Sequence, residues 1–319
     1  MNILGTGHYL PQNIMTNDHI SQLVDTSDTW ISSRTGIRKR HISGGENTSD
    51  LAVQAALKTF ENSGIQPAEI ELVIVATTTP DSFVPGVAHQ VLKRLQIPQA
   101  MAFDINAACT GFIYALDTAA ALMEARNLKR ALVIGSEVLS KIVDWTDRNT
   151  CVLFGDGAGA VILGHEPGKK LLYAKSTALP DMEEVLYSGG LAVNNPLTQE
   201  EQTKIAIGMK GQEVFKFAVS KVSSSIKEGL EATGLTQEDI AYFVLHQANQ
   251  RILDFAAKRL EIPEHKIYST IEYTGNTSAA SIPITLDEMN QKGLLKKGMK
   301  LVLSGFGAGL TYGMMLIEW

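Results

Sequence analysis

The stretch Ser63–Ala76 reads SGIQPAEIELVIVA, and Thr233–His246 reads TGLTQEDIAYFVLH, 170 positions further along the chain. Each copy carries a small hydroxyl residue, a glycine, an aliphatic residue, a polar stretch, an isoleucine and then an apolar run typical of a buried strand. A second pair, Leu132–Gly135 and Leu301–Ser304, recurs at an offset of 169. The shared offset predicts two similar halves divided near residue 165; the alternative is a generic helix–turn–strand likeness.

Apolar runs and helical patterns alternate along the chain, which is typical of an α/β fold whose sheets are covered by helices. The predicted strands are Leu72–Ala76, Ala131–Ile134, Ala160–Leu163, Phe243–Leu245 and Leu301–Leu303. The predicted helices are Thr48–Asn62, Val84–Leu95, Thr110–Ala125, Met209–Ala232, Asn249–Leu260 and Ala279–Asn290. Thr177–Gln202 has weak periodicity and several Gly, Pro and Asn residues, so we expect a long loop there.

Composition and charge narrow the possible functions. The 319 residues are 45% hydrophobic and 19% charged, an ordinary globular composition. A net charge of −6 argues against a general nucleic-acid-binding protein, which is usually basic. The two cysteines lack neighbours at zinc-ligand spacing, so we expect neither a disulfide scaffold nor a metal site. The N-terminus lacks a basic start and no apolar run reaches the ~20 residues of a membrane span, so we expect a cytoplasmic protein.

A candidate nucleophile lies in Ala102–Tyr114, which reads AFDINAACTGFIY. A short strand is predicted to end near Ile105, and an Ala-rich helix follows Cys109. The free amides and the dipole at a helix N-terminus favour an anion, so we expect a lowered thiol pKa for this residue. The alternative is an inert buried cysteine. Cys151, which precedes an apolar run, is expected to be structural.

Two further candidates lie in the second half. His246 ends the predicted strand Phe243–Leu245, and ligand sites in α/β sheets gather at the carboxyl ends of strands. Asn276 lies at a helix start that corresponds in the repeat to the one after Cys109, at an offset of 167. The alternatives are a structural histidine and a plain helix N-cap. The glycine-rich turn Gly305–Gly313, GFGAGLTYG, is suited to presenting backbone N–H groups to an oxyanion.

Together these residues resemble the β-ketoacyl-acyl carrier protein synthase III family of thiolase-fold condensing enzymes. The resemblance runs from Gly5 to the C-terminus. The motifs that carry it are DTSDTWISSRTGIRKRH (Asp25–His41), AACTGF (Ala107–Phe112), DWTDRNTCVLFGDGAGA (Asp144–Ala160), HQANQRI (His246–Ile252) and YTGNTSAASIP (Tyr273–Pro283). The resemblance implies two similar α/β halves, residues 1–165 and 166–319, packed as a five-layer αβαβα sandwich.

The resemblance also implies a site and a reaction that starts fatty-acid synthesis. The catalytic triad would be Cys109, His246 and Asn276, and the backbone N–H groups of Cys109 and Ala308 would form the oxyanion hole. Cys109 would take an acyl group from a short acyl-CoA. Malonyl-acyl carrier protein would then lose carbon dioxide, and its enolate would attack the acyl-cysteine to give a β-ketoacyl product.

Substrate contacts implied by the resemblance extend to the protein surface. The positions that match family contacts to coenzyme A are Trp30, Arg34, Arg148, Gln212 and Asn249. The positions that match contacts to acyl carrier protein are Lys216, Gln247, Arg251 and Lys258. The resemblance implies a homodimer with no tightly bound cofactor, in which Val84 reaches across into the acyl pocket. Departures from the family pattern are Thr110 for a frequent Ser, Ala308 for Gly and Tyr312 for Trp.

Other functions stay open at this point. A secondary-metabolite condensing enzyme would share the triad. A Cys-His-Asn hydrolase would release free acid without a malonyl donor, and a non-catalytic CoA-binding protein would leave Cys109 unacylated. Asn276 argues against elongating synthases, which use a second histidine there, and the lack of a cysteine at Gly305–Gly307 argues against degradative thiolases. Acetyl-CoA is the default primer, and branched or longer primers remain alternatives.

Overall fold

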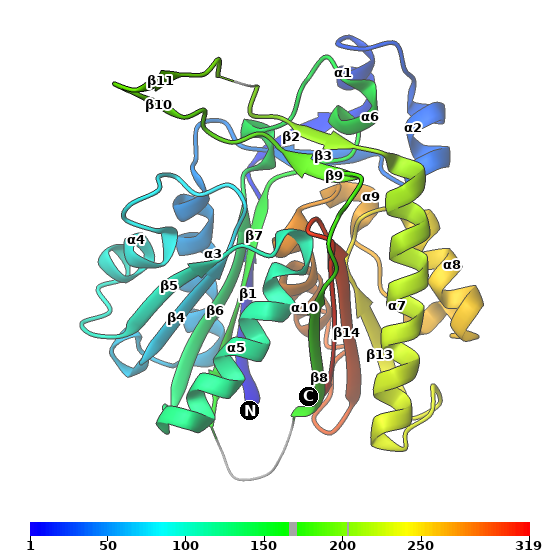
Figure 1. The fold of residues 1–319 in the computed structure, drawn as a ribbon. Helices are drawn as coiled ribbons and strands as arrows, with labels where there is room; N and C mark the ends of the chain where they lie inside the picture. Colours follow the sequence, from blue (N-terminus) through cyan, green and yellow to red (C-terminus); the bar gives the residue numbers. More distant parts are fainter. Residues whose placement is uncertain (166–170, 203) are drawn as a thin grey trace.

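The computed structural model describes residues 1–165, 171–202 and 204–319. Two sheets stand side by side and each is covered by helices (Figure 1). The strand order is β1-β7-β6-β4-β5 in the first sheet and β13-β14-β15-β8 in the second. The first sheet uses strands before residue 165 and the second uses strands after residue 170. The predicted boundary near residue 165 adjoins 166–170, which lie outside the described residues.

The first sheet contains a strand that is buried along its whole length. Its strands are β1 (Asn2–Tyr9), β4 (Leu72–Ala76), β5 (Met101–Ile105), β6 (Arg130–Glu137) and β7 (Gly157–Gly164). β4 runs parallel to β5 and β6, whereas β7 is antiparallel to β1 and β6. All five residues of β4 are buried, because helices cover both faces of the sheet.

The second sheet repeats this order. Its strands are β8 (Leu171–Ala178), β13 (Ile240–Leu245), β14 (Lys300–Gly307) and β15 (Thr311–Glu318). β13 is parallel to β14, and β15 is antiparallel to β14 and β8. An isolated parallel bridge from Ile267 to Phe243 stands where β5 stands in the first sheet. This is the arrangement that the sequence repeat predicts.

Helices complete five layers. They are α3 (Thr48–Ser63), α4 (Val87–Arg94), α5 (Gly111–Arg126), α7 (Gly211–Thr233), α8 (Gln250–Leu260) and α10 (Ser281–Gln291). α3 and α4 cover the outer face of the first sheet, α7 and α8 that of the second, and α5 and α10 lie between the sheets (Figure 1). Apolar side chains fill the space on each side of both sheets. The predicted αβαβα sandwich is confirmed.

Helix ends show the repeat in detail. α3 ends at Gly64 and α7 at Gly234, 170 positions apart, with φ of 71° and 69°. Glycine adopts this left-handed conformation without a Cβ penalty, so both helices stop at the predicted turns. The helix predicted from Val84 begins only at Val87, because the carboxylate of Asp104 accepts the N–H groups that open it, including that of Val87 at 2.7 Å.

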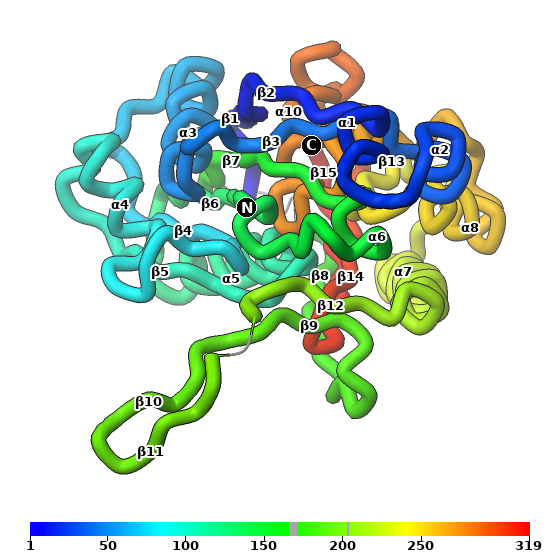
Figure 2. The backbone as a smooth tube through the Cα atoms, turned by 90° about the horizontal axis from the view of Figure 1, so that it is seen from above, coloured from blue at the N-terminus to red at the C-terminus, as the bar shows by residue number. Residues whose placement is uncertain are grey.

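Smaller elements lie beyond one end of the two sheets. They are β2 (Asn13–Thr16), β3 (Lys39–Ile42), α1 (Asn17–Ser21), α2 (Asp28–Thr35), α6 (Arg148–Cys151) and α9 (Ile271–Thr274). The segment predicted as a loop over 177–202 is irregular except for short strands. β9 (Leu186–Ser188) pairs with β12 (Ile207–Met209), and the hairpin of β10 (Asn194–Asn195) and β11 (Thr198–Gln199) projects from the body (Figure 2). No helix in the described ranges is long and apolar enough to cross a membrane.

Candidate active site

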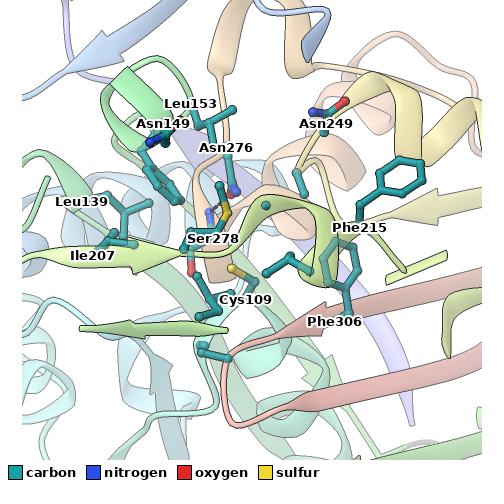
Figure 3. A pocket seen from close by; sticks show the side chains of 18 of the residues that line it. Cys109, Leu139, Asn149, Leu153, Ile207, Phe215, Asn249, Asn276, Ser278 and Phe306 are labelled. Atoms are coloured by element: carbon teal, nitrogen blue, oxygen red, sulfur yellow. Dashed lines mark hydrogen bonds between the residues drawn. The ribbon is translucent and has the colours of Figure 1, made fainter. Parts of the chain in front are cut away.

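A cavity of about 980 Å³ lies where the two halves meet, beyond the carboxyl ends of β5 and β13. Cys109, His246, Asn276 and Ala308 all line it. Figure 3 shows Cys109 from the first half and Asn276 from the second pointing into the same space. The cavity therefore brings together the residues that the sequence predicts to act as one site.

The turn that carries Cys109 is packed tightly from the other half. β5 ends at Ile105, a 3₁₀ turn spans Ala108–Thr110, and α5 begins at Gly111, so the predicted strand-to-helix position of Cys109 is confirmed. A Cβ on Gly307, at the end of β14, would lie 2.7 Å from the backbone nitrogen of Cys109. Only a residue without a side chain fits at this contact.

The expected lowering of the Cys109 pKa is wrong for this structure. Burial raises the pKa of the thiol to about 12, a hydrogen bond with Ser278 lowers it in part, and the charge of Glu137 raises it further. Loss of hydration therefore outweighs the effect of the helix N-terminus. Cys109 holds its proton at neutral pH in this state, so acyl transfer needs a route for that proton.

His246 follows β13 and is almost fully buried. Burial lowers its pKa to about 3, so the ring is neutral. Its Nδ1 lies 2.7 Å from the Ser281 hydroxyl, which accepts the Gln247 backbone N–H at 3.4 Å. The Ser281 proton is then free to donate to Nδ1, which leaves the hydrogen on Nε2. That Nε2 is buried without a hydrogen-bond partner in the described part of the chain, so its N–H is left to donate to a molecule in the cavity.

Asn276 is fixed by its backbone and by its own side chain. Its N–H donates to Leu153 O at 2.9 Å, and its carbonyl accepts from Gly155 at 3.0 Å. The side-chain Oδ1 accepts from the Ser278 N–H at 2.9 Å. Because the oxygen is used in this way, the NH₂ group is the part of the amide that remains to donate into the cavity.

The repeat register differs from the one predicted for Asn276. The 3₁₀ turns Ala108–Thr110 and Ser278–Ala280 match at an offset of 170, and their first residues share φ values of 47° and 49°. Asn276 therefore corresponds to Asn106, and Cys109 to Ala279. The helix starts are equivalent as expected, but the offset of 167 was wrong by three residues because the sequence does not show where the 3₁₀ turn begins.

Two departures from the family pattern, Ala308 and Thr110, fit the structure without strain. Ala308 follows β14 with a negative φ, so its methyl group imposes no left-handed strain. Cys109 and Ala308 both line the cavity. Thr110 is fully buried, and its hydroxyl pairs with that of Thr311 at 2.9 Å, which ties the start of α5 to β15.

A cluster of one aromatic and two basic side chains lies at the cavity mouth. The guanidinium carbon of Arg34 is 4.5 Å from the Trp30 ring centroid, and that of Arg148 is 5.0 Å from it. The predicted coenzyme A positions that line the cavity are Trp30, Arg34, Gln212 and Asn249. Arg148 does not line the cavity itself, but it contacts the Trp30 ring, which does. The arrangement suits a flat aromatic ring that carries phosphate.

Three of the four predicted carrier-protein contacts are exposed. Arg251 and Lys216 line the mouth and Lys258 lies further along α8, although Lys216 pairs with Glu213 at 2.8 Å. The prediction that Gln247 contacts acyl carrier protein is wrong, because the side chain is fully buried. Its amide donates to the Leu245 carbonyl at 2.8 Å and accepts from the Thr270 N–H at 2.9 Å. It holds the site together and offers nothing to a docking partner.

Sequence reasoning missed several residues around the triad. Ser278 and Phe306 line the cavity, and the Phe306 ring meets the His246 ring edge-on with centroids 5.3 Å apart. Glu137 is buried behind Ser278. A signal was present, because Glu137 is an acid three positions after the predicted apolar strand Ala131–Ile134. No group of three His, Cys, Asp or Glu suited to a metal ion occurs among the residues that the structure describes.

Comparisons with known proteins decide the family. Models for "3-Oxoacyl-[acyl-carrier-protein (ACP)] synthase III" and for its C-terminal region match residues 103–178 and 230–319. A β-ketoacyl-[acyl-carrier-protein] synthase III of Clostridium acetobutylicum is 52% identical over 322 residues, covering 99% of this chain and 98% of its own length. The chain belongs to the β-ketoacyl-acyl carrier protein synthase III family.

Solved structures agree with this membership. The 3-oxoacyl-[acyl-carrier-protein] synthase III of Aquifex aeolicus superposes with a TM-score of 0.93 at 42% identity, over 99% of both chains. A priming β-ketosynthase of the R1128 polyketide pathway gives 0.93 at 34% identity, over 99% of this chain and 95% of its own. The synthase III family consists of condensing acyltransferases, and the fold described above is its thiolase fold.

Proposed function

We propose that this protein joins a short acyl-CoA primer to malonyl-acyl carrier protein, with loss of carbon dioxide, to give a β-ketoacyl-acyl carrier protein. The observation that carries the proposal is the convergence of Cys109, His246 and Asn276 on one cavity between the two halves. No two of these residues come from the same loop. Two half-reactions follow from their chemistry.

In the first half-reaction, the Cys109 sulfur attacks the thioester carbonyl of the primer and coenzyme A leaves. The carbonyl oxygen gains negative charge, and the backbone N–H groups of Cys109 and Ala308 are the donors that we assign to it. The acyl group stays on the sulfur while one substrate replaces the other.

In the second half-reaction, decarboxylation places negative charge on the malonyl thioester oxygen. His246 offers a neutral Nε2–H and Asn276 an amide N–H. Two neutral donors stabilise an enolate by hydrogen bonding and are too weakly acidic to protonate it. A carboxylate in either place would repel the developing charge. The enolate carbon then attacks the acyl-cysteine carbonyl.

The substrates enter over different surfaces of the same mouth. We assign the adenine ring to the Trp30, Arg34 and Arg148 cluster, and the pantetheine arm to Gln212 and Asn249. Acyl carrier protein is acidic and would dock on the basic side chains Arg251, Lys216 and Lys258. Both half-reactions use thioesters alone, so we assign no tightly bound cofactor.

We also infer a homodimer. Phe83 and Val84 are 79% and 86% exposed, which is unusual for neighbouring large apolar side chains. They lie in the loop that follows β4, and β5 is the edge strand of the first sheet. A second copy that covers this face would bury both side chains and take Val84 towards an acyl pocket. A cytoplasmic location stays a prediction.

A secondary-metabolite condensing enzyme is the second candidate, because the polyketide priming ketosynthase shares the fold at 34% identity. It would use the same triad with a different carrier protein or primer. Matched assays with fatty-acid and polyketide carrier proteins separate the two functions.

The decisive experiment records the intact mass of the protein after incubation with acetyl-CoA, beside Cys109→Ala. A gain of one acetyl group that is absent from the variant supports the first half-reaction, and malonyl-acyl carrier protein then tests the second. A gain only with branched or longer acyl-CoA keeps the mechanism and changes the primer. Release of free acid without condensation would mean a hydrolase, and no acylation by any acyl-CoA would overturn the proposal.

A further inference from the structure

Glu137 is a buried acid that the mechanism above leaves without a role. It ends β6 and is 0% exposed. Its carboxylate accepts from the Thr78 N–H at 3.1 Å and from the hydroxyls of Thr77 and Thr79 at 3.2 and 2.6 Å. It also accepts from the Ser278 hydroxyl at 3.2 Å. Burying a carboxylate costs desolvation free energy, and an apolar residue at this position would not incur that cost.

Ser278 connects this carboxylate to the nucleophile. Its hydroxyl donates to Glu137 Oε1 and is also the hydrogen-bond partner of the Cys109 side chain. Figure 3 shows Ser278 beside Cys109 in the cavity. Its backbone N–H donates to Asn276 Oδ1 at 2.9 Å. Ser278 has a φ of 49°, a conformation that a serine keeps only where its surroundings hold it. The hydroxyl therefore has a thiol and a carboxylate as its two partners.

The other candidate base is poorly suited to take the Cys109 proton. His246 is buried and neutral, and burial lowers its pKa to about 3, so it holds an added proton weakly. Burial moves Glu137 in the opposite direction and raises its pKa, which makes this carboxylate a better acceptor than an exposed one. Lys141 is near enough to interact electrostatically with Glu137, but within the described ranges the two side chains form no ion pair.

We propose that Glu137, acting through the Ser278 hydroxyl, receives the Cys109 proton during acyl transfer. As the sulfur bonds to the thioester carbonyl carbon, the thiol proton passes to Ser278 Oγ and the Ser278 proton passes to Glu137 Oε1. The bond from the carbonyl carbon to the sulfur of coenzyme A then breaks. The departing thiolate takes a proton back from Glu137 by the same path, which restores the carboxylate. Ser278 touches the reacting sulfur, and Glu137 is a positioning and proton-holding residue behind it.

The inference rests on the proposed function, and two variants test it. Glu137→Gln keeps the shape of the side chain but cannot accept a proton, and Ser278→Ala removes the connection while leaving the carboxylate its threonine donors. Each is compared with wild type in single-turnover acylation by acetyl-CoA, followed by intact mass. Each is then loaded by long incubation, separated from acetyl-CoA and mixed with malonyl-acyl carrier protein to time the condensation alone.

We expect both variants to slow acylation about 100-fold or more, the range of general base catalysis, and to leave condensation within about fivefold. The matched control is Asp156→Asn. Asp156 is also fully buried in the first half and accepts the N–H groups of Ser43 and Ser140 at 2.7 and 2.9 Å, but it does not line the cavity. It should leave the ratio of the two rates unchanged.

Equal losses in both half-reactions would assign Glu137 a purely structural role and overturn the inference. Acylation of Glu137→Gln at or above the wild-type rate would also overturn it, because the carboxylate would then act only by repelling the thiolate. Thermal unfolding identifies a variant that fails to fold, in which case Ser278→Ala carries the test. Wild-type protein that no acyl-CoA acylates would contradict the proposed function itself, a result distinct from either of these.

Discussion

Asn106 and Asn276 occupy equivalent places in the two halves, 170 residues apart, and each accepts a hydrogen bond from the backbone N–H two residues on. The distances are 3.3 Å to Ala108 and 2.9 Å to Ser278. Both side chains line the cavity, but Asn106 is exposed and Asn276 is buried. One duplicated turn thus carries the proposed nucleophile in the first half and the proposed enolate donor in the second.

This pair supplies a matched test of the enolate donor. Asn276→Ala should slow decarboxylative condensation about 100- to 1,000-fold, because it removes one of two donors to the malonyl thioester oxygen. Acylation of Cys109 should change little. Asn106→Ala removes the same group from the same turn geometry and should leave condensation within a few fold. Separate timing of the two half-reactions checks this, and a similar loss in both variants would contradict the assignment.

The raised pKa of Cys109 predicts how the free protein reacts with iodoacetamide. A thiol pKa near 12 instead of the usual 9 leaves roughly 1,000-fold less thiolate at neutral pH. Alkylation should therefore be slow at pH 7 and its rate should still be rising above pH 10. Intact mass against pH measures this, with Cys109→Ala to report any reaction at buried Cys151. A rate that levels off near pH 7 would contradict the predicted burial of the thiol.

The aromatic and basic cluster at the mouth predicts a defect specific to coenzyme A. Trp30→Ala should raise the KM for acetyl-CoA about tenfold, or ~1.4 kcal/mol, with little change in kcat, because stacking on adenine and cation–π support are lost. The matched control is a pantetheine thioester that lacks the nucleotide. Its KM should not change, and an equal rise for both substrates would place the effect inside the cavity instead.

Charge reversal tests carrier-protein docking. Arg251→Glu should raise the KM for malonyl-acyl carrier protein about tenfold at low salt and less at high salt, since screening weakens an exposed contact. Lys297→Glu makes the same charge change before the start of β14, at the end of the sheet away from the cavity. The control should behave as wild type. A matching effect in both variants would mean that only net charge matters.

Val84 gives a test of the dimer. Val84→Phe should shift primer preference towards shorter acyl chains, because a ring from the second copy would fill part of the acyl pocket. Leu57→Phe, on the outer helix α3, is also partly exposed and should leave preference unchanged. Relative acylation rates with acetyl-CoA and a longer acyl-CoA measure the effect. An unchanged ratio in Val84→Phe would remove Val84 from the pocket.

Much of the fold could be predicted because local pattern and tertiary structure agree. The strand Leu72–Ala76 is apolar throughout, and burial on both faces makes that composition stable. Cys109 and His246 could be placed because each lies within four residues of the end of a predicted strand. Helix α4 was predicted too early because the carboxylate that opens it lies on β5, which the local sequence does not reveal.

The errors at the site arise from tertiary contacts that lie outside the local sequence pattern. A lowered Cys109 pKa follows from its own helix, whereas the wall that excludes water comes largely from residues such as Phe306 and Ala308. Gln247 has the composition of a surface residue, but its partners are backbone groups around Thr270. Cys109 meets residues about 200 positions away and Gln247 meets a backbone group 23 positions away, and local sequence patterns reveal neither contact.

The contact of Gly307 with the backbone of Cys109 also sets the order in which the protein becomes reactive during synthesis. Cys109 is synthesised 191 residues before Lys300, where the strand that packs on its amide begins. A nascent chain that stops before Lys300 has its thiol but neither this packing nor the turn at Ala308. The surroundings that shape the site around this thiol therefore form only after β14 has been synthesised.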